Sequence, residues 1–316
     1  MAENNLPSGF FFIDKPYGIT SHDIVSKMRK ILNTKKIGHA GTLDPMATGV
    51  MALGVGTSTR LLDYVQTGIK TYIAHLAFGE KSSTGDVEGD IIETVDMANL
   101  TREELDNACQ KFIGTIEQIP PMTSAVKVDG KALYKYARQG IEVERKIRTT
   151  HIYSIEIIDF DCEENSQPKA TLKIVCSVGT YIRTLAEDIA QSAGGVAHLS
   201  DLRRIKSGTI DESNLVTLEN LSSLSNPFEF MCEPSLAMSH FKTIHFDESQ
   251  VGEIYTGRKL ILSDSQKEEL KVDSGKYFVG LGKTPRNLLA MYDNPFNENS
   301  DNSNNLKSRC VIFLDL

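Results

Sequence analysis

The chain lacks the features of a disulfide-stabilised, zinc-binding or membrane protein. Its 316 residues include only five cysteines, which are widely spaced and form no C-x-x-C pair. This spacing argues against a disulfide framework and against a zinc site. No apolar run approaches the roughly 20 residues that cross a bilayer, and residues 1–9 lack the basic and apolar segments of a signal peptide. We therefore expect a cytoplasmic protein with reduced thiols.

Signatures of nucleotide and metal chemistry are missing as well. The sequence contains no Walker loop, no strand-linked G-x-G-x-x-G and no cluster with metal-ligand spacing. The segment at 54–57 (GVGT) resembles a phosphate-binding turn, but its position favours a simple connection between a strand and the next helix. We expect neither a cofactor nor a metal ion.

Charge is unevenly distributed along this acidic chain. The net charge of −8 is unusual for a protein that binds nucleic acid. Basic groups nevertheless occur at 29–36 and 203–206, and the acidic excess lies at 80–106, 156–164 and 264–301. Between 120 and 150, three acidic residues accompany seven basic ones: Lys127, Lys131, Lys135, Arg138, Arg145, Lys146 and Arg148. This polarity predicts one face that attracts a polyanion, although ordinary solvated lysines and arginines are the alternative interpretation.

Hydrophobic periodicity predicts strands and helices that alternate irregularly. Thr20 with Asp23, and Thr101 with Glu104, begin helices with capping residues. The predicted strands are 10–13, 50–55, 70–78, 149–160 and 169–178, and a further helix covers 181–192. Strands that neighbour strands indicate an α+β fold with a mixed or antiparallel sheet.

A polar stretch from about 221 to 239 predicts a domain boundary. We expect one domain at 1–239 and a second, small and β-rich, at 240–316. The second domain reads as a strand from Phe241, a helix at 247–256 and short strands at 277–281, 288–292 and 310–314. The Asn/Asp/Ser-rich segment at 293–305 predicts a disordered loop.

The most informative segment is 38–50, which reads GHAGTLDPMATGV. It places one carboxylate, Asp44, among three glycines, a histidine and a proline, directly before an apolar run. Glycine permits close approach of another molecule, and Pro45 restricts the backbone at Asp44. The pattern predicts a rigid loop that presents one acid. A tight turn with an N-capping aspartate is the structural alternative.

The thirteen-residue string closely resembles the catalytic-aspartate loop of the TruB family of pseudouridine synthases, which isomerise a uridine in the T-loop of tRNA. Four more blocks resemble family motifs, in the family's order, over roughly the first 210 residues. They are 14–21 (DKPYGITS), 70–72 (KTY), 120–127 with 130–131 (PPMTSAVK and GK), and 179–185 (GTYIRTL). The resemblance implies a pseudouridine synthase domain with an RNA-clamping insertion at about 120–150. The C-terminal region resembles, more weakly, the family's PUA-type RNA-binding module.

The resemblance also implies roles for individual residues. Asp44 would be the essential catalytic group, and Arg183 its ion-pair partner. Tyr72 would stack on the target uracil and handle a proton. His39 would fill the gap left by the flipped base, Leu202 would line the uracil pocket, and Lys15 and Lys127 would contact the RNA backbone. Four of these residues have a plain structural alternative: a surface arginine for Arg183, a core residue for Tyr72 and Leu202, and a structural histidine for His39.

The chemistry needs an ionised Asp44, whose unperturbed pKa of about 3.9 would rise on burial unless a cation offsets the loss of solvent. A carboxylate serves as nucleophile or base. Attack on C1′, attack on uracil C6 and removal of the C2′ proton with a glycal intermediate all remain open.

The leading hypothesis is a stand-alone synthase that modifies the uridine at position 55 of tRNA. A guide-RNA-dependent synthase of the dyskerin type is the nearest alternative, and a tRNA-folding chaperone is a third. We expect tRNA, through its T-arm, as the partner, with no protein partner, no membrane and a monomeric state.

Overall fold

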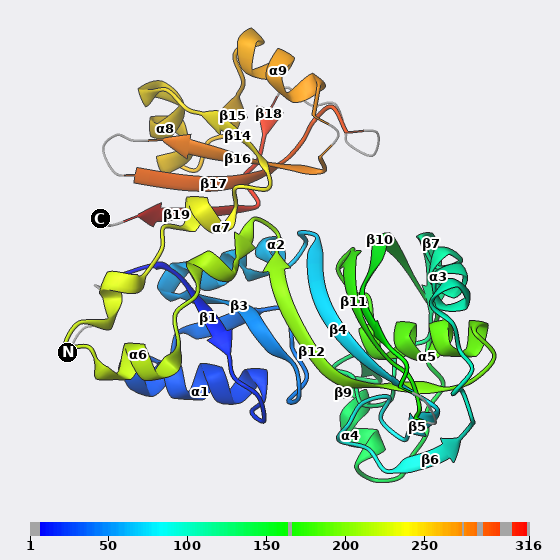
Figure 1. Ribbon diagram of the computed structural model, residues 1–316. Coiled ribbons are helices and arrows are strands. Elements are labelled where there is room, and N and C mark those ends of the chain that lie inside the picture. Colours follow the sequence, from blue (N-terminus) through cyan, green and yellow to red (C-terminus); the bar gives the residue numbers. More distant parts are fainter. Residues whose placement is uncertain (1–6, 164–165, 274, 283–286, 298–304, 315–316) are drawn as a thin grey trace.

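The computed structural model describes residues 7–163, 166–273, 275–282, 287–297 and 305–314 (Figure 1). A nine-stranded sheet forms its centre, with the path β1-β3-β12-β4-β11-β10-β7 and with β2 beside β3 and β13 beside β12. The strands are β1 (Gly9–Lys15), β2 (Ile37–Ala40), β3 (Thr48–Val55), β4 (Lys70–Phe78), β7 (Gly114–Gln118), β10 (Arg148–Asp161), β11 (Lys169–Cys176), β12 (Ala197–Ser207) and β13 (Ile210–Asp211). The predicted α+β class with a mixed sheet is confirmed.

The sheet changes direction where β3 meets β12. β3 pairs antiparallel with β1 along its length and parallel with β12 only at Thr48 and Gly49. Gly49 has φ +98°, and a Cβ there would lie 2.2 Å from the carbonyl oxygen of Arg204. Only glycine tolerates both conditions. The loop that precedes β3 is therefore anchored at a fixed point in the middle of the sheet.

The predicted helices begin at their predicted caps. Thr20 and Asp23 form a capping box at α1 (Ser21–Ile31), and Thr101 and Glu104 form one at α3 (Arg102–Gln110). α5 (Ile182–Ser192) packs its apolar side chains with α3 against β4, β11 and β12 in one buried cluster. The short helices are η2 (Gly56–Leu61), α2 (Leu62–Val65), η3 (Glu212–Asn214), α6 (Leu218–Ser223), η4 (Pro227–Phe230) and α7 (Pro234–Ala237).

The basic segment at 120–150 is an excursion between two paired strands. β7 ends at Gln118, directly opposite Arg148, the first residue of β10. Between them lie β8 (Lys127–Val128), β9 (Lys131–Ala132) and α4 (Leu133–Ala137). Figure 1 shows α4 and β9 below α5, on the same side as the hairpin of β5 (Glu80–Ser82) and β6 (Ile91–Thr94). We call residues 119–147 the insertion.

The C-terminal region contains a second sheet, in the order β14-β16-β17-β19. Its elements are β14 (Lys242–His245), α8 (Glu248–Tyr255), β15 (Leu260–Ile261), α9 (Asp264–Lys271), β16 (Tyr277–Gly282), β17 (Asn287–Asp293), β18 (Asn305–Leu306) and β19 (Cys310–Leu314). All three predicted strands after residue 270 are present. Most of the predicted disordered loop, 298–304, lies outside the described residues.

This second sheet packs on the first, above β1 and α2 in Figure 1. Phe10 and Phe12 of β1 share one buried cluster with Val279 and Leu289. Arg60 also donates a hydrogen bond of 2.9 Å to the Val311 carbonyl. The domain boundary at 239/240 stays a prediction. Within the described residues, no helix has the length and apolarity needed to cross a membrane.

Candidate active site

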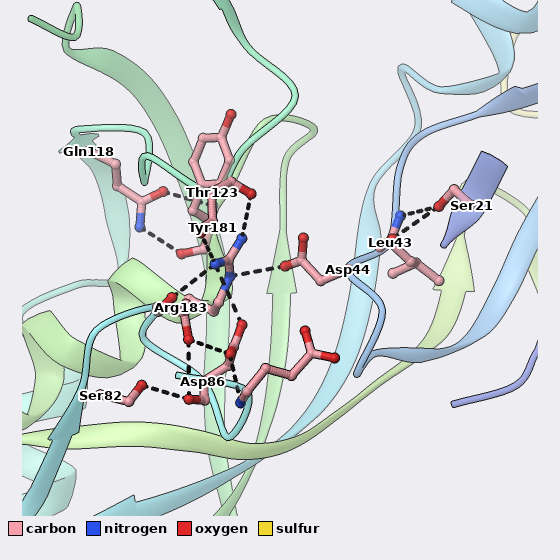
Figure 2. Close-up of polar contacts among 11 residues, drawn as sticks. Ser21, Leu43, Asp44, Ser82, Asp86, Gln118, Thr123, Tyr181 and Arg183 are labelled. Atoms are coloured by element: carbon pink, nitrogen blue, oxygen red, sulfur yellow. Dashed lines mark hydrogen bonds and ion pairs between the residues drawn. The ribbon is translucent and has the colours of Figure 1, made fainter. Parts of the chain in front are cut away.

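Asp44 lies in the loop between β2 and β3, and residues of the block 14–21 form hydrogen bonds with this loop on both sides of Asp44. The Lys15 ammonium donates to the carbonyls of Pro45 (3.0 Å) and Ala47 (2.7 Å). The Gly18 amide donates to the Pro45 carbonyl as well, at 2.9 Å. On the other side, the Ser21 hydroxyl donates to the Leu43 carbonyl and accepts from its amide (Figure 2). The loop is thus fixed immediately before and after Asp44.

Arg183, the second residue of α5, reaches Asp44 from the other half of the sheet. Its Nε lies 2.9 Å from Oδ2 of Asp44, and its Nη1 lies 3.5 Å from Oδ2 of Asp86. Nη1 also donates to the Thr84 carbonyl at 2.9 Å. The Arg183 side chain is only 5% exposed and Asp86 only 3%. One buried cation therefore serves two carboxylates, as Figure 2 shows.

The pKa of Asp44 is raised above its ordinary value. Burial is the main cause, and the neighbouring Asp86 charge acts in the same direction. The charge of Arg183 and its hydrogen bond act against this rise, and Lys15 adds a smaller lowering effect. The ionised carboxylate thus depends on Arg183. The Asp44 side chain itself is 32% exposed, so its carboxylate is accessible to a ligand.

Asp44 and Arg183 line a cavity of about 330 Å³. Tyr72 of β4 and Leu202 of β12 form buried aromatic and apolar parts of its wall. Burial raises the pKa of the Tyr72 phenol, so the phenol is neutral at physiological pH. A planar base extruded from RNA is held by apolar and aromatic walls of this kind.

The cavity brings together four of the predicted site residues: Asp44, Tyr72, Arg183 and Leu202. His39 on β2 is half-buried and outside the cavity lining, and burial and the charge of Arg204 lower the pKa of its imidazole. Lys127 is exposed on β8. The predicted roles of these two residues stay predictions.

Lys15 makes its polar contacts within the protein, and its predicted contact with the RNA backbone stays a prediction. Its side chain is fully buried, and its ammonium is used by the carbonyls of Pro16, Pro45 and Ala47. Burial lowers the pKa of Lys15 to about 8. Through these hydrogen bonds Lys15 positions the Asp44 loop.

In the basic group at 203–206, Lys206 is exposed, whereas the two arginines are engaged within the protein. Arg203 pairs with Asp14 at 3.0 Å and with Glu212 at 2.6 Å. Arg204 is 2% exposed and donates to the Val50 carbonyl at 2.8 Å. Arg204 lines the cavity instead, beside Tyr72.

Three buried charged residues of the site were not identified from the sequence: Asp86, Lys70 and Arg204. Asp86 had been counted with the acidic surface at 80–106. Lys70 lines the cavity, and burial with the charge of Arg204 lowers its pKa to about 7. Its place in the K-T-Y block was the available signal. Among the described residues, no group of three or more His, Cys, Asp or Glu side chains is arranged to hold a metal ion.

Two family models match the chain. Residues 29–182 match the TruB family pseudouridylate synthase N-terminal domain, and residues 183–229 match the tRNA pseudouridylate synthase B C-terminal domain. A relative from Neisseria meningitidis serogroup B, named tRNA pseudouridine synthase B, is 38% identical over 290 residues, covering 90% of this chain and 92% of the relative. This chain belongs to the TruB family. The resemblance drawn from the five motif blocks is confirmed.

Other TruB relatives give the same result. The tRNA pseudouridine synthase B of Bacillus pumilus is 38% identical over 87% of this chain and 91% of its own length. That of Listeria monocytogenes is 45% identical over 69% of this chain and 72% of its own length. Among solved structures, a Cbf5-Nop10-Gar1 complex contains a similar chain with a TM-score of 0.70 and 24% identity, covering 96% of this chain and 84% of that one. This last likeness shows the shared fold.

Proposed function

We propose that this TruB-family chain is a stand-alone tRNA pseudouridine synthase, an isomerase that converts the T-loop uridine at position 55 to pseudouridine. The observation that carries the proposal is the Asp44–Arg183 ion pair on a cavity walled by Tyr72 and Leu202. The relatives that bear the name tRNA pseudouridine synthase B support the choice of tRNA as substrate.

The target uridine must leave the folded T-loop before it enters the cavity. Extrusion costs on the order of a few kcal/mol, which contacts with the extruded base offset. Tyr72 and Leu202 supply the two walls between which the uracil is held. His39, just ahead of the Asp44 loop, is the proposed residue that fills the gap in the RNA.

Asp44 then acts on the extruded nucleotide. The reaction breaks the N1–C1′ bond, turns the base and forms a C5–C1′ bond, and the C5 proton is lost while N1 gains one. An ionised Asp44 initiates it by attack on C1′ or C6 or by removing the C2′ proton. Arg183 keeps the carboxylate ionised in each case. The neutral phenol of Tyr72 is the proposed group for proton transfer at the base.

The insertion is the proposed grip on the T-arm. Four basic residues of the insertion are exposed, and so is Arg148 directly after it. The four are Lys127, Lys135, Arg138 and Lys146. Such side chains contact phosphates and give affinity without reading sequence. We propose a monomer that acts in the cytoplasm, where its tRNA substrate occurs.

A guide-RNA-dependent synthase is the alternative that the fold alone would allow. The relatives at 38% identity over most of the chain favour the stand-alone enzyme. The test is incubation of the purified protein with an unmodified tRNA transcript, without other RNA or protein, followed by mapping of pseudouridine at each uridine. One new pseudouridine in the T-loop is expected. Tight tRNA binding without modification would favour the guide-dependent or chaperone hypothesis.

A further inference from the structure

Thr123, in the insertion, contacts the catalytic arginine directly. Its hydroxyl oxygen accepts a hydrogen bond from Nη1 of Arg183, and its carbonyl lies 3.4 Å from Nη2 (Figure 2). Thr123 is thus bonded to the far end of the guanidinium whose Nε pairs with Asp44. The side chain of Arg183 alone therefore separates the insertion from the Asp44 carboxylate.

The root of the insertion is fixed to the same end of α5. Gln118, at the end of β7, is 2% exposed, and its side-chain amide forms two hydrogen bonds with the backbone of Tyr181. Tyr181 is the N-cap residue of α5. The stretch from 118 to 123 therefore contacts the start of this helix at two points, and Thr123 is the one that reaches the ion pair.

On its other side, Thr123 continues into the part of the insertion that carries the exposed basic residues. The amide of Tyr134 donates to the Ser124 carbonyl at 3.1 Å, and the amide of Leu133 donates to the Val126 carbonyl at 2.8 Å. These bonds connect the start of α4 to the irregular segment 124–126, which precedes β8, and Lys127 and Lys135 flank them. Because Ser124 directly follows Thr123, a displacement of these lysines by bound RNA would be transmitted to Thr123 through these bonds and the chain itself.

The position of the Arg183 guanidinium depends on its hydrogen bond with the Thr123 hydroxyl. Its Nη1 faces Asp86, the Thr84 carbonyl and the Thr123 hydroxyl. Without the hydroxyl, the remaining acceptors of Nη1 lie on the Asp86 side, so the planar guanidinium is drawn towards Asp86 and away from Asp44. We propose that Thr123 is a positioning residue that holds Arg183 against Asp44 and couples the placement of the insertion to this ion pair. The inference rests on the proposed pseudouridine synthase activity.

Thr123→Val removes the hydroxyl at nearly constant volume, and Thr123→Ser retains it. Single-turnover rates with saturating enzyme, measured from pH 5.5 to 9, separate chemistry from binding, and the tRNA Kd is measured independently. Thr123→Val is expected to lower the single-turnover rate at pH 7 about tenfold and to move the acidic limb of the pH–rate profile to higher pH. Its Kd for tRNA should stay within about twofold of the wild-type value. Thr123→Ser is expected to restore most of the rate and the original limb.

The pH shift follows from the groups that face Asp44. Weaker pairing with Arg183 raises the pKa of Asp44, since burial and Asp86 already favour its protonated form. The charged and titratable groups around it are Arg183, Asp86, Glu88, Lys15, Tyr72 and Tyr181. A purely structural role for Thr123 lowers stability without moving this limb.

Thr123→Ala serves as the second hydroxyl-free variant in case Val is not folded. A wild-type rate and limb in the folded hydroxyl-free variant would overturn the inference. The inference would also be overturned if Thr123→Ser lost as much of the single-turnover rate as the hydroxyl-free variant, in parallel with reduced thermal stability and with the acidic limb of the pH profile unchanged. An inactive wild type would instead contradict the proposed function, so the two failures are distinguishable.

Discussion

The Asp44 carboxylate lies 2.9 Å from Nε of Arg183, although one residue precedes β3 and the other is the second residue of α5. Each side of this pair has its own support. Lys15, Gly18 and Ser21 fix the Asp44 loop, and Gln118 fixes the N-terminus of α5. The ion pair therefore joins the Asp44 loop to the N-terminus of α5, and each of these segments is held by hydrogen bonds of its own.

Loss of Arg183 is expected to be severe for stability and activity together. Arg183→Met leaves the carboxylates of Asp44 and Asp86 without their shared cation, at an expected cost of about 3–5 kcal/mol in the free energy of unfolding. Urea denaturation measures this cost. Arg203→Met, which removes two partly exposed ion pairs, is the control and costs about 1 kcal/mol or less for each pair. Equal costs for the two variants would refute the assigned role of Arg183.

Asp86→Asn is expected to shift the pH dependence in the direction opposite to Thr123→Val. The Asp86 charge raises the pKa of Asp44, so its removal lowers that pKa and moves the acidic limb of the rate to lower pH. Asparagine keeps an oxygen for the Thr84 hydroxyl and the Glu88 amide. The maximal single-turnover rate should fall about tenfold, because Arg183 loses one anchor.

A limb in Asp86→Asn that moves to higher pH, or does not move, would show that Asp86 does not control the ionisation of Asp44. Thermal unfolding of the same preparation controls for loss of folded protein.

Lys15 and Lys127 were predicted to have the same role, and the structure separates them. Lys15→Met leaves buried carbonyls without a donor and is expected to cost about 2 kcal/mol of stability and to slow catalysis. Lys127→Met alters an exposed side chain, so stability is unchanged while tRNA affinity falls and the salt slope decreases by roughly one. Urea denaturation and tRNA binding at several salt concentrations test both. Weaker tRNA binding by a fully stable Lys15→Met would contradict this assignment.

Lys70 gives a prediction about stability and pH. Its pKa falls from 10.5 to about 7 on folding, so between these values the unfolded chain holds a proton that the folded chain has released. The contribution of Lys70 to the free energy of unfolding therefore increases as pH rises through this window. Lys70→Met should show a flatter curve than the wild type between pH 7 and 9, by up to about 1 kcal/mol per pH unit.

Unfolding by urea at pH 7, 8 and 9 measures the difference between the curves. The curve of Lys173→Met, at a partly exposed position on β11, should be parallel to that of the wild type. A Lys70→Met curve parallel to it as well would mean that Lys70 is not neutralised on folding.

Elements with a regular local pattern were predictable from the sequence. The helices at α1 and α3 have capping boxes, and β4 alternates buried and half-buried residues from Tyr72 onward. β12 was missed because it carries four charged residues and two register shifts, which destroy the alternation. α9 was missed because its sequence is almost entirely polar and buries only Gln266 and Leu270.

Asp44, Tyr72 and Arg183 were predictable as candidates because each lies in a recognisable motif block, and Leu202, outside these blocks, came from the family resemblance. All four line one cavity. The partner of Arg183 on its other side, Asp86, lies in a polar turn that is typical of a solvated surface. Burial of a charge depends on tertiary contacts, which local sequence does not encode.

The most direct test of the account compares the wild type with Asp44→Asn on an unmodified tRNA transcript, with pseudouridine mapped at single-nucleotide resolution and the tRNA Kd measured for both. One new pseudouridine in the T-loop is expected with the wild type, and a rate at least about 10³-fold lower with Asp44→Asn at unchanged Kd. Modification by Asp44→Asn at a rate near that of the wild type would contradict it.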